Sequence, residues 1–208
     1  MVKSPRLRQQ QVKQLRIAVL EAVIAKLEST APGDVSMADI ARTAGVSLRT
    51  LYRYFPTRVA LLQSAGEYLY DSLGVPVDIA EPEDISRSFS EAARRLAARP
   101  KLTRALIRTG AGQAARSAIR TQRVNAIRST LEPATAGLDA DLAKGATALI
   151  AHLCSATSWV SIADESGLSD AEAQRAVSWA IDMLIDALRR TARSSGRRRL
   201  RQVVPEEQ

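Results

Sequence analysis

The side chains with the clearest chemical potential lie close together between Ser36 and Arg58, a segment rich in hydroxyl, guanidinium and phenol groups. Such groups bind phosphate through hydrogen bonds and ionic contacts, and arginine also reads the edge of guanine. Candidates for catalysis or metal binding are few, because His152 is the only histidine and Cys154 the only cysteine. We therefore expect a protein that binds a polyanion, with no enzymatic activity, no metal and no cofactor.

The same segment has the pattern of two short helices joined by a tight turn. Ser36 can cap the first helix, and Asp39 three residues later completes a capping-box pattern. Gly45 follows where the chain needs a residue with positive φ. Ser47 can cap the second helix, and Leu51 points back into the core. The pattern predicts a helix-turn-helix, whose second helix enters the major groove of DNA. An ordinary helical hairpin with a solvated basic face would share the glycine turn but not the whole combination.

The segment closely resembles the DNA-binding signature of the TetR family of transcriptional regulators. The matching stretches are Ile40-Ala41, Ala44-Gly45-Val46-Ser47, Thr50-Leu51-Tyr52-Arg53-Tyr54-Phe55 and Leu61-Leu62, within roughly residues 12–62. By position, the resemblance implies DNA contacts at Ser36, Ser47, Leu48, Arg49, Thr50, Tyr52, Tyr54, Thr57 and Arg58. The exposed side of the second helix adds Arg53. Leu48 and Arg49 fall where the family often reads bases, and the family usually has lysine in place of Arg58.

Basic side chains concentrate at both ends of the chain. Residues 1–62 carry ten Lys and Arg against four Asp and Glu, whereas residues 63–188 carry 13 against 16, and residues 189–208 carry seven against two. A basic N-terminal part favours a polyanionic partner, although a solvated surface with a basic tail would give the same distribution. Lys3, Arg6 and Arg8 could form an arm along DNA or a frayed solubilising terminus.

The whole chain has the composition of helices packed on helices. Hydrophobic residues make up 46% and aromatic residues only 4%, and apolar residues recur at spacings of three and four between prolines. We predict an all-α fold of about nine helices, near residues 10–27, 37–44, 48–54, 58–73, 83–98, 101–109, 113–131, 139–165 and 169–192. No apolar run approaches the ~18 residues that span a bilayer, and no signal peptide is visible, so we expect a cytoplasmic protein without membrane contact.

We expect three parts in the chain. Residues 1–62 would form the helix-turn-helix DNA-binding domain, residues 63–193 a helical regulatory and dimerisation domain, and residues 194–208 a basic, disordered tail. The resemblance implies a homodimer in which the last two helices pair with their symmetry mates, although these faces could instead pack within one chain. Two copies would read a palindromic operator in double-stranded DNA.

The resemblance also implies a small-molecule effector bound in the second domain, and the apolar middle helices favour an apolar one. The candidate lining residues are Leu102, Leu106, Ile107, Ile119, Ile127, Trp159, Trp179 and Met183, each of which would also suit plain core packing. The stretch Leu102-Thr103-Arg104-Ala105-Leu106, together with Trp159, resembles the KstR-like regulators of lipid and steroid catabolism.

The favoured function is therefore a repressor that a small apolar effector releases from a palindromic operator. One alternative is a constitutive or activator-type DNA-binding regulator without an effector. Another is a helical small-molecule binder or enzyme whose basic N-terminal part is incidental.

Overall fold

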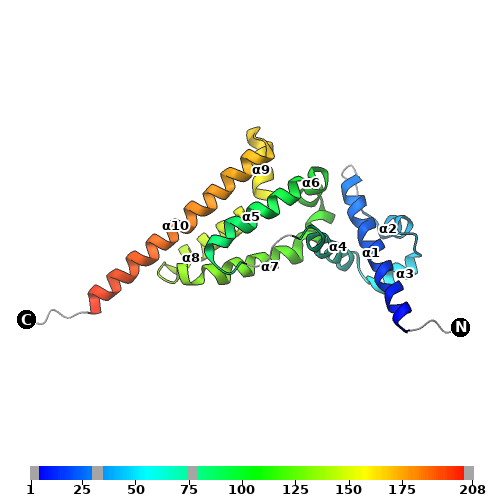
Figure 1. Cartoon of the computed structure of the whole chain (residues 1–208), viewed down its shortest axis with the longest axis horizontal. Helices are drawn as coiled ribbons and strands as arrows, with labels where there is room; N and C mark the ends of the chain where they lie inside the picture. Colours follow the sequence, from blue (N-terminus) through cyan, green and yellow to red (C-terminus); the bar gives the residue numbers. More distant parts are fainter. Residues whose placement is uncertain (1–4, 30–34, 75–78, 204–208) are drawn as a thin grey trace, which may run out of the picture. The chain divides into compact units, whose positions relative to one another are not determined.

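The computed structural model describes residues 5–29, 35–74 and 79–203, and every regular element within these ranges is a helix (Figure 1). The all-α fold predicted from composition and periodicity is confirmed, with ten helices in the described ranges where about nine were expected. They are α1 (Pro5–Ser29), α2 (Met37–Thr43), α3 (Leu48–Tyr54), α4 (Arg58–Leu73), α5 (Pro82–Ala97), α6 (Pro100–Arg108), α7 (Gly110–Thr135), α8 (Ala140–Leu153), α9 (Ala156–Ser166) and α10 (Asp170–Val203).

The additional helix comes from a break at Ser155. A single helix over residues 139–165 was predicted, and this was wrong, because α8 and α9 meet at a bend of 69°. Ser155 has an extended backbone, and its Oγ accepts a hydrogen bond of 3.3 Å from the backbone N–H of Ser158, which caps α9. Among the described helices none alone is long and apolar enough to cross a membrane, although α8 and α9 together meet that criterion.

Two helices extend beyond their predicted ends. α1 begins at Pro5 instead of near Gln10, and α10 continues to Val203. Residues 194–203 are therefore helical where a disordered tail was predicted, and residues 204–208 of that tail lie outside the described residues. Arginine and leucine propagate helices well, and cations near a helix C-terminus interact favourably with the helix dipole, so extending α10 costs little.

The helices fall into two compact units. The first comprises residues 1–74 and 99–119, and the second comprises residues 75–98 and 120–208. In the first unit α1 packs on α2, α4 and α6. Its apolar face ends at Leu27, and beyond that residue an ion pair of 2.5 Å joins Glu28 to Arg99 at the start of α6.

α4 and α7 approach each other closely within the first unit. A Cβ atom on Gly66 would lie 1.8 Å from the carbonyl oxygen of Ala115, so only glycine fits at this position. One turn away, Gln63 Nε2 donates a hydrogen bond of 3.0 Å to Ser117 Oγ. α4, which follows directly on the predicted helix-turn-helix, is thus held against α7 by backbone proximity and by a side-chain hydrogen bond.

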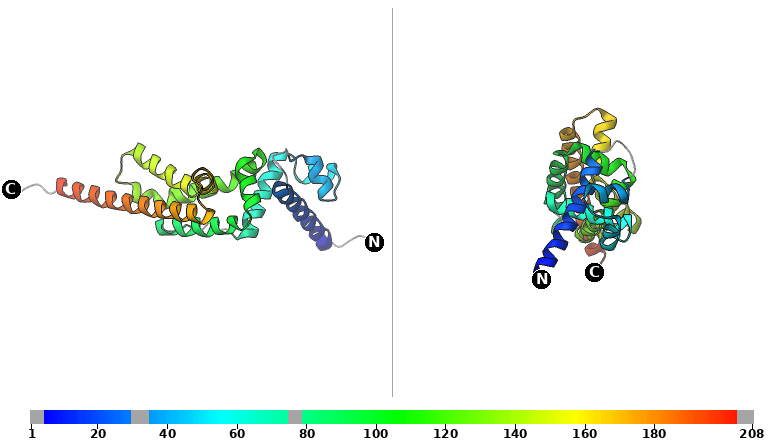
Figure 2. Two further views of the ribbon diagram at one scale, coloured as in Figure 1. Left: turned by 90° about the horizontal axis from the view of Figure 1, so that it is seen from above. Right: turned by 90° about the vertical axis from the view of Figure 1, so that its right-hand side faces the viewer.

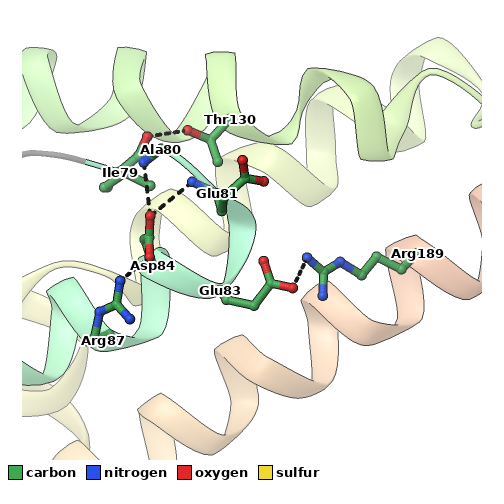
Figure 3. A network of polar contacts seen from close by, with 8 residues as sticks. All are labelled: Ile79, Ala80, Glu81, Glu83, Asp84, Arg87, Thr130 and Arg189. Carbon is green, nitrogen blue, oxygen red and sulfur yellow. Dashed lines mark hydrogen bonds and ion pairs between the residues drawn. The ribbon is translucent and has the colours of Figure 1, made fainter.

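In the second unit α5 lies alongside α10 (Figures 1 and 2). The hydroxyl groups of Ser86 and Ser178 are 2.8 Å apart, and an ion pair joins Glu83 to Arg189 (Figure 3). The pKa of Glu83 is lowered, chiefly because its carboxylate accepts a hydrogen bond from Arg189. Polar contacts at two levels therefore fix the register between these helices.

Asp84 organises the start of α5. One of its oxygens accepts hydrogen bonds from the backbone N–H groups of Ala80, at 3.1 Å, and Glu81, at 3.0 Å (Figure 3). The bond from the Glu81 N–H is the main reason that the pKa of Asp84 is lowered. Thr130 Oγ1 on α7 donates a hydrogen bond of 2.8 Å to the carbonyl oxygen of Ile79, which ties the preceding segment to α7.

Candidate nucleic-acid interface

α2 begins at a serine cap of the predicted kind. Ser36 Oγ accepts a hydrogen bond of 3.1 Å from the backbone N–H of Asp39 and donates one of 2.6 Å to the Asp39 carboxylate. Arg42 forms an ion pair of 2.8 Å with the same carboxylate. The bond from Ser36, more than the charge of Arg42, lowers the pKa of Asp39. The acidic side chain of α2 is therefore engaged within its own helix.

The turn between α2 and α3 depends on a left-handed residue. Gly45 has a φ of 66°, and the backbone N–H of Val46 donates a hydrogen bond of 2.9 Å back to the carbonyl oxygen of Ala41. The turn ends at Ser47, whose Oγ accepts a hydrogen bond of 3.1 Å from the backbone N–H of Thr50 and caps α3. The chain therefore reverses direction within a few residues and starts α3 at a fixed point.

α3 presents one side to the core and the other to solvent. Leu51 is fully buried, whereas Leu48 and Tyr52 are 42% and 46% exposed. Arg49 and Arg53 are also exposed. A seven-residue helix with two exposed apolar side chains and two exposed guanidinium groups has the chemistry of a helix that reads base edges in a major groove.

Two arginine–aromatic contacts lie at the end of α3. The guanidinium group of Arg53 lies 4.8 Å from the ring centre of Tyr54 and donates a hydrogen bond of 3.0 Å to its hydroxyl oxygen. Phe55 is buried, and the guanidinium group of Arg16 on α1 lies 5.2 Å from its ring centre. The Arg16 contact joins α1 to the end of the candidate recognition helix.

α4 starts immediately after this aromatic group. Thr57 Oγ1 accepts a hydrogen bond of 3.1 Å from the backbone N–H of Ala60 and caps α4. Arg58 Nε donates a hydrogen bond of 2.9 Å to the carbonyl oxygen of Val35, just before α2. Arg58 therefore connects the start of α4 to the start of the helix-turn-helix, a positioning role that the sequence did not predict.

The ten residues predicted to contact DNA all lie at the cap of α2, in α3 or at the start of α4. Six are exposed, namely Ser47, Leu48, Arg49, Tyr52, Arg53 and Thr57, and four are partly buried, namely Ser36, Thr50, Tyr54 and Arg58. Arginine is the only cationic residue type between positions 36 and 58, with four side chains against the single acid Asp39. The surface around α3 is therefore suited to a polyanion.

Comparison with known proteins supports this interpretation of the segment. Residues 21–65 match the family model described as bacterial regulatory proteins of the tetR family. This segment is therefore similar to the N-terminal part of tetR-family regulators. The matched residues span about the last third of α1, the helix-turn-helix and the first half of α4, and they include each of the ten residues above.

Solved structures extend the likeness to most of the chain. A TetR transcriptional regulator from Rhodococcus sp. RHA1 superposes with a TM-score of 0.55 at 23% identity, over 84% of this chain and 98% of that one. A second transcriptional regulator from the same organism gives 0.56 at 20% identity, over 83% and 96%. A tetR-family regulator from Streptomyces coelicolor gives 0.52 at 18% identity, over 94% and 91%. The fold is that of TetR-family transcriptional regulators. A search of curated proteins finds no match.

The predicted ligand-binding residues are divided between the two units. Leu102, Leu106 and Ile119 are buried, and Ile107 is half-buried, in the first unit of this TetR-like fold, whereas Ile127 and Trp159 are buried in the second, and Trp179 and Met183 lie on α10. Trp179 is 67% exposed and Met183 is 44% exposed. Trp159 is 1% exposed, and its indole Nε1 has no hydrogen-bond partner among the described residues.

Three surface grooves are well formed in the second unit. One of 540 Å³ lies between the start of α5, α7 and α10, and one of 480 Å³ lies between α7 and α8. The third, of 380 Å³, lies between α8 and α10 and is mainly apolar, with Leu142, Leu149 and Leu184 among its lining residues. None of the eight predicted ligand-binding residues lines any of these three grooves.

Proposed function

We propose that this chain is a DNA-binding transcription regulator that places α3 in the major groove of an operator. The observation that carries the proposal is the division of α3 into a face anchored by buried Leu51 and an exposed face with Leu48, Arg49, Tyr52 and Arg53. Serine caps and a glycine turn fix that helix relative to α2. The TetR-family match of residues 21–65 supports the same conclusion.

Within this interface the side chains divide into two roles. Arg49 and Leu48 at the start of α3 would read base edges, with Ser47 contributing, because guanidinium and methyl groups recognise guanine and thymine. Ser36, Thr50, Tyr52, Tyr54, Thr57 and Arg58 would bind phosphate groups. The hydrogen bond from Arg58 to Val35 supports its role, because a partly fixed guanidinium loses less conformational freedom on binding a phosphate.

The same proposal includes a homodimer formed through α8 and α10, in a second domain of about residues 63–193. Leu142 and Leu149 on α8 and Trp179 and Met183 on α10 are large apolar side chains exposed in the single chain. Exposed apolar surface of this kind marks interaction sites, and covering it with a second copy would remove it from water. The exposure of Trp179 and Met183 supports an interface role over a place in an effector cavity.

We further propose that a small apolar effector releases the protein from its operator. Buried Trp159 supports a ligand site, because an indole N–H in an apolar interior ordinarily has a hydrogen-bond acceptor. An effector needs about 1–3 kcal/mol of differential affinity for the two states to act as a switch. A constitutive or activator-type regulator would share the same α3 surface and would bind no effector.

Selection of bound duplexes from a random pool tests the proposed function directly. We expect enrichment of a palindrome whose half-sites lie about 10 base pairs apart, or a multiple of that spacing, because two symmetry-related copies of α3 face one side of the duplex. The full-length chain should be used at low ionic strength. Failure to enrich any duplex would contradict the proposal, and enrichment of unpaired half-sites would contradict the dimer.

A further inference from the structure

The first half of α1 has no fully buried side chain among those described, although Val12, Leu15 and Ile17 are half-buried. Among the residues of α1 whose side chains are described, the first buried one is Val19, and Arg6, Gln9, Gln10, Lys13 and others before it are exposed. The early turns of α1 project beyond α2 and α3 (Figures 1 and 2). Helical turns with little tertiary packing are marginal in water, so a partner would stabilise this extension.

One side of this extension carries a stripe of exposed polar side chains. This stripe lies on the same side of α1 as the buried residues that pack in the core of the first unit. Residues 20, 23 and 27 are buried against the rest of the first unit, and counting back from residue 20 by four and three gives Arg16, Lys13, Gln9 and Arg6. The same side of α1 is therefore apolar where it meets α2, α4 and α6 and cationic or amide-bearing where it projects past them. Such a cationic stripe is suited to binding an anionic partner.

The stripe is continuous with the candidate recognition surface. Arg16 lies over the ring of Phe55, which directly follows α3, so the contact places the C-terminal end of the stripe at the end of that helix. Arg6 is ten residues further along α1, about 15 Å at ~1.5 Å per residue. A duplex carries one phosphate charge per ~1.7 Å of its axis, so a surface of this length faces several phosphates.

Charge also selects the partner. Positions 5–20 contain four cations and no acid, and the first turn of α1 has no acidic residue to complement the helix dipole. The positive charge of Arg6 in that turn is unfavourable beside the positive end of the helix dipole, which makes the isolated extension less stable. A phosphate group bound there would interact favourably with both the dipole and the guanidinium group.

We propose that residues 5–16 of α1 form a second DNA-contacting surface, which binds the phosphate backbone beside the duplex segment read by α3. This inference rests on the proposed function, because it extends that interface along the same duplex. The contact is made through charge and amide groups along one stripe and carries no base preference.

The test compares the variant Arg6→Gln, Lys13→Gln with the wild type on one selected duplex. Glutamine keeps helix propensity, so the variant removes two charges from the stripe without breaking α1. In a dimer that loses four contacts, the slope of log Kd against log salt should fall by about 3 to 4, and affinity near ~0.1 M salt should fall at least about tenfold. Base preference should be unchanged. The matched control is Arg120→Gln, Lys144→Gln, which removes two exposed cations from α7 and α8.

Hydrogen exchange gives a second readout of the same proposal. Backbone amides of residues 6–16 should gain protection when the wild-type protein binds DNA and should gain less in the variant. An unchanged salt slope with unchanged protection would overturn the proposal, as would an equal loss in the control variant. If the wild type binds no duplex, the proposed function itself fails. If the wild type binds and Arg49→Ala loses its base preference while Arg6→Gln, Lys13→Gln behaves as wild type, only the α1 surface is refuted.

Discussion

Arg58 Nε donates a hydrogen bond of 2.9 Å to the backbone carbonyl oxygen of Val35, 23 residues earlier in the chain. The bond links the start of α4 to the residue before the cap of α2, so it fixes the two ends of the helix-turn-helix segment relative to each other. Val35 is buried, and its carbonyl oxygen would lose this partner if the guanidinium group were removed.

Replacing Arg58 with alanine should therefore weaken DNA binding and also reduce the stability of the first unit. We expect similar losses of affinity on every duplex, because a phosphate contact carries no sequence information, and a loss of about 1 kcal/mol in unfolding free energy for the hydrogen bond. Urea denaturation and titration of matched and random duplexes measure the two effects. Arg58→Lys should recover part of the affinity through its charge. Unchanged affinity and stability in Arg58→Ala would contradict both roles.

Arg49→Ala should change which sequences are bound, and not only how tightly. Arg49 is exposed at the start of α3, where a guanidinium group can form a bidentate contact with guanine worth about 1–3 kcal/mol of discrimination. Repeating the duplex selection with the variant should relax the preference at one position in each half-site. Arg42→Ala is a suitable control, because Arg42 is exposed on α2 and pairs with Asp39 in its own helix. An identical enriched sequence for wild type and Arg49→Ala would mean that Arg49 reads no base.

Gly66→Ala should destabilise the first unit, because its Cβ atom would lie 1.8 Å from the Ala115 carbonyl oxygen. Separating α4 from α7 enough to relieve the clash should cost about 1–3 kcal/mol, as overpacking usually does. Thermal or urea unfolding measures the loss. Gly110→Ala serves as the control, since no atom lies within 4 Å of a Cβ built there. Equal stability of the two variants would show that the helices separate without cost.

Asp84→Asn should lower stability at neutral pH and have no effect in acid. The pKa of Asp84 is lowered in the folded chain, first by the hydrogen bond from the Glu81 N–H, so ionised Asp84 stabilises the fold. That stabilisation is fully present above the ordinary pKa of 3.8 and is lost as the pH falls through the lower folded value. Unfolding curves of both proteins across this pH range should therefore converge at the acid end. A difference between them that does not vary with pH would show that the charge of Asp84 is unimportant.

Trp179→Glu should disrupt the proposed dimer while leaving the fold of the protomer intact. Trp179 is largely exposed in the single chain, so its replacement removes little core, whereas a buried unpaired carboxylate at an interface is costly. Sedimentation should show a monomer, and circular dichroism should show unchanged helix content. Leu168→Glu, at the exposed turn between α9 and α10, is the control that should remain dimeric. Persistence of the wild-type mass in Trp179→Glu would place the interface elsewhere.

The helix-turn-helix could be predicted from the sequence because its signals are local. Ser36, Gly45 and Ser47 each act on backbone groups within a few residues, so their types and spacing are sufficient to place α2 and α3. The break at Ser155 could not be predicted in the same way, because a serine within an apolar run is compatible with either a continuous helix or a cap. Packing around α8 and α9 decides whether the helix continues through Ser155 or ends there.

Contacts between distant segments explain the other differences. The bond from Arg58 to Val35 and the approach of Gly66 to Ala115 require the fold to be known before either residue has a partner. The candidate effector residues were chosen from apolar positions, and apolar type alone does not separate a cavity wall, a core residue and an exposed face. Trp159 and Trp179 illustrate this, since one is buried and the other faces solvent.

The contrast between these two indoles gives the protein its own pair of optical reporters. Trp159 and Trp179 are the only tryptophans in the chain. The enclosed indole of Trp159 should emit at shorter wavelength and be shielded from aqueous quenchers, whereas that of Trp179 should emit at longer wavelength and be quenched readily. Self-association would alter the Trp179 signal and occupation of the interior would alter the Trp159 signal, so both events can be followed without attaching a dye.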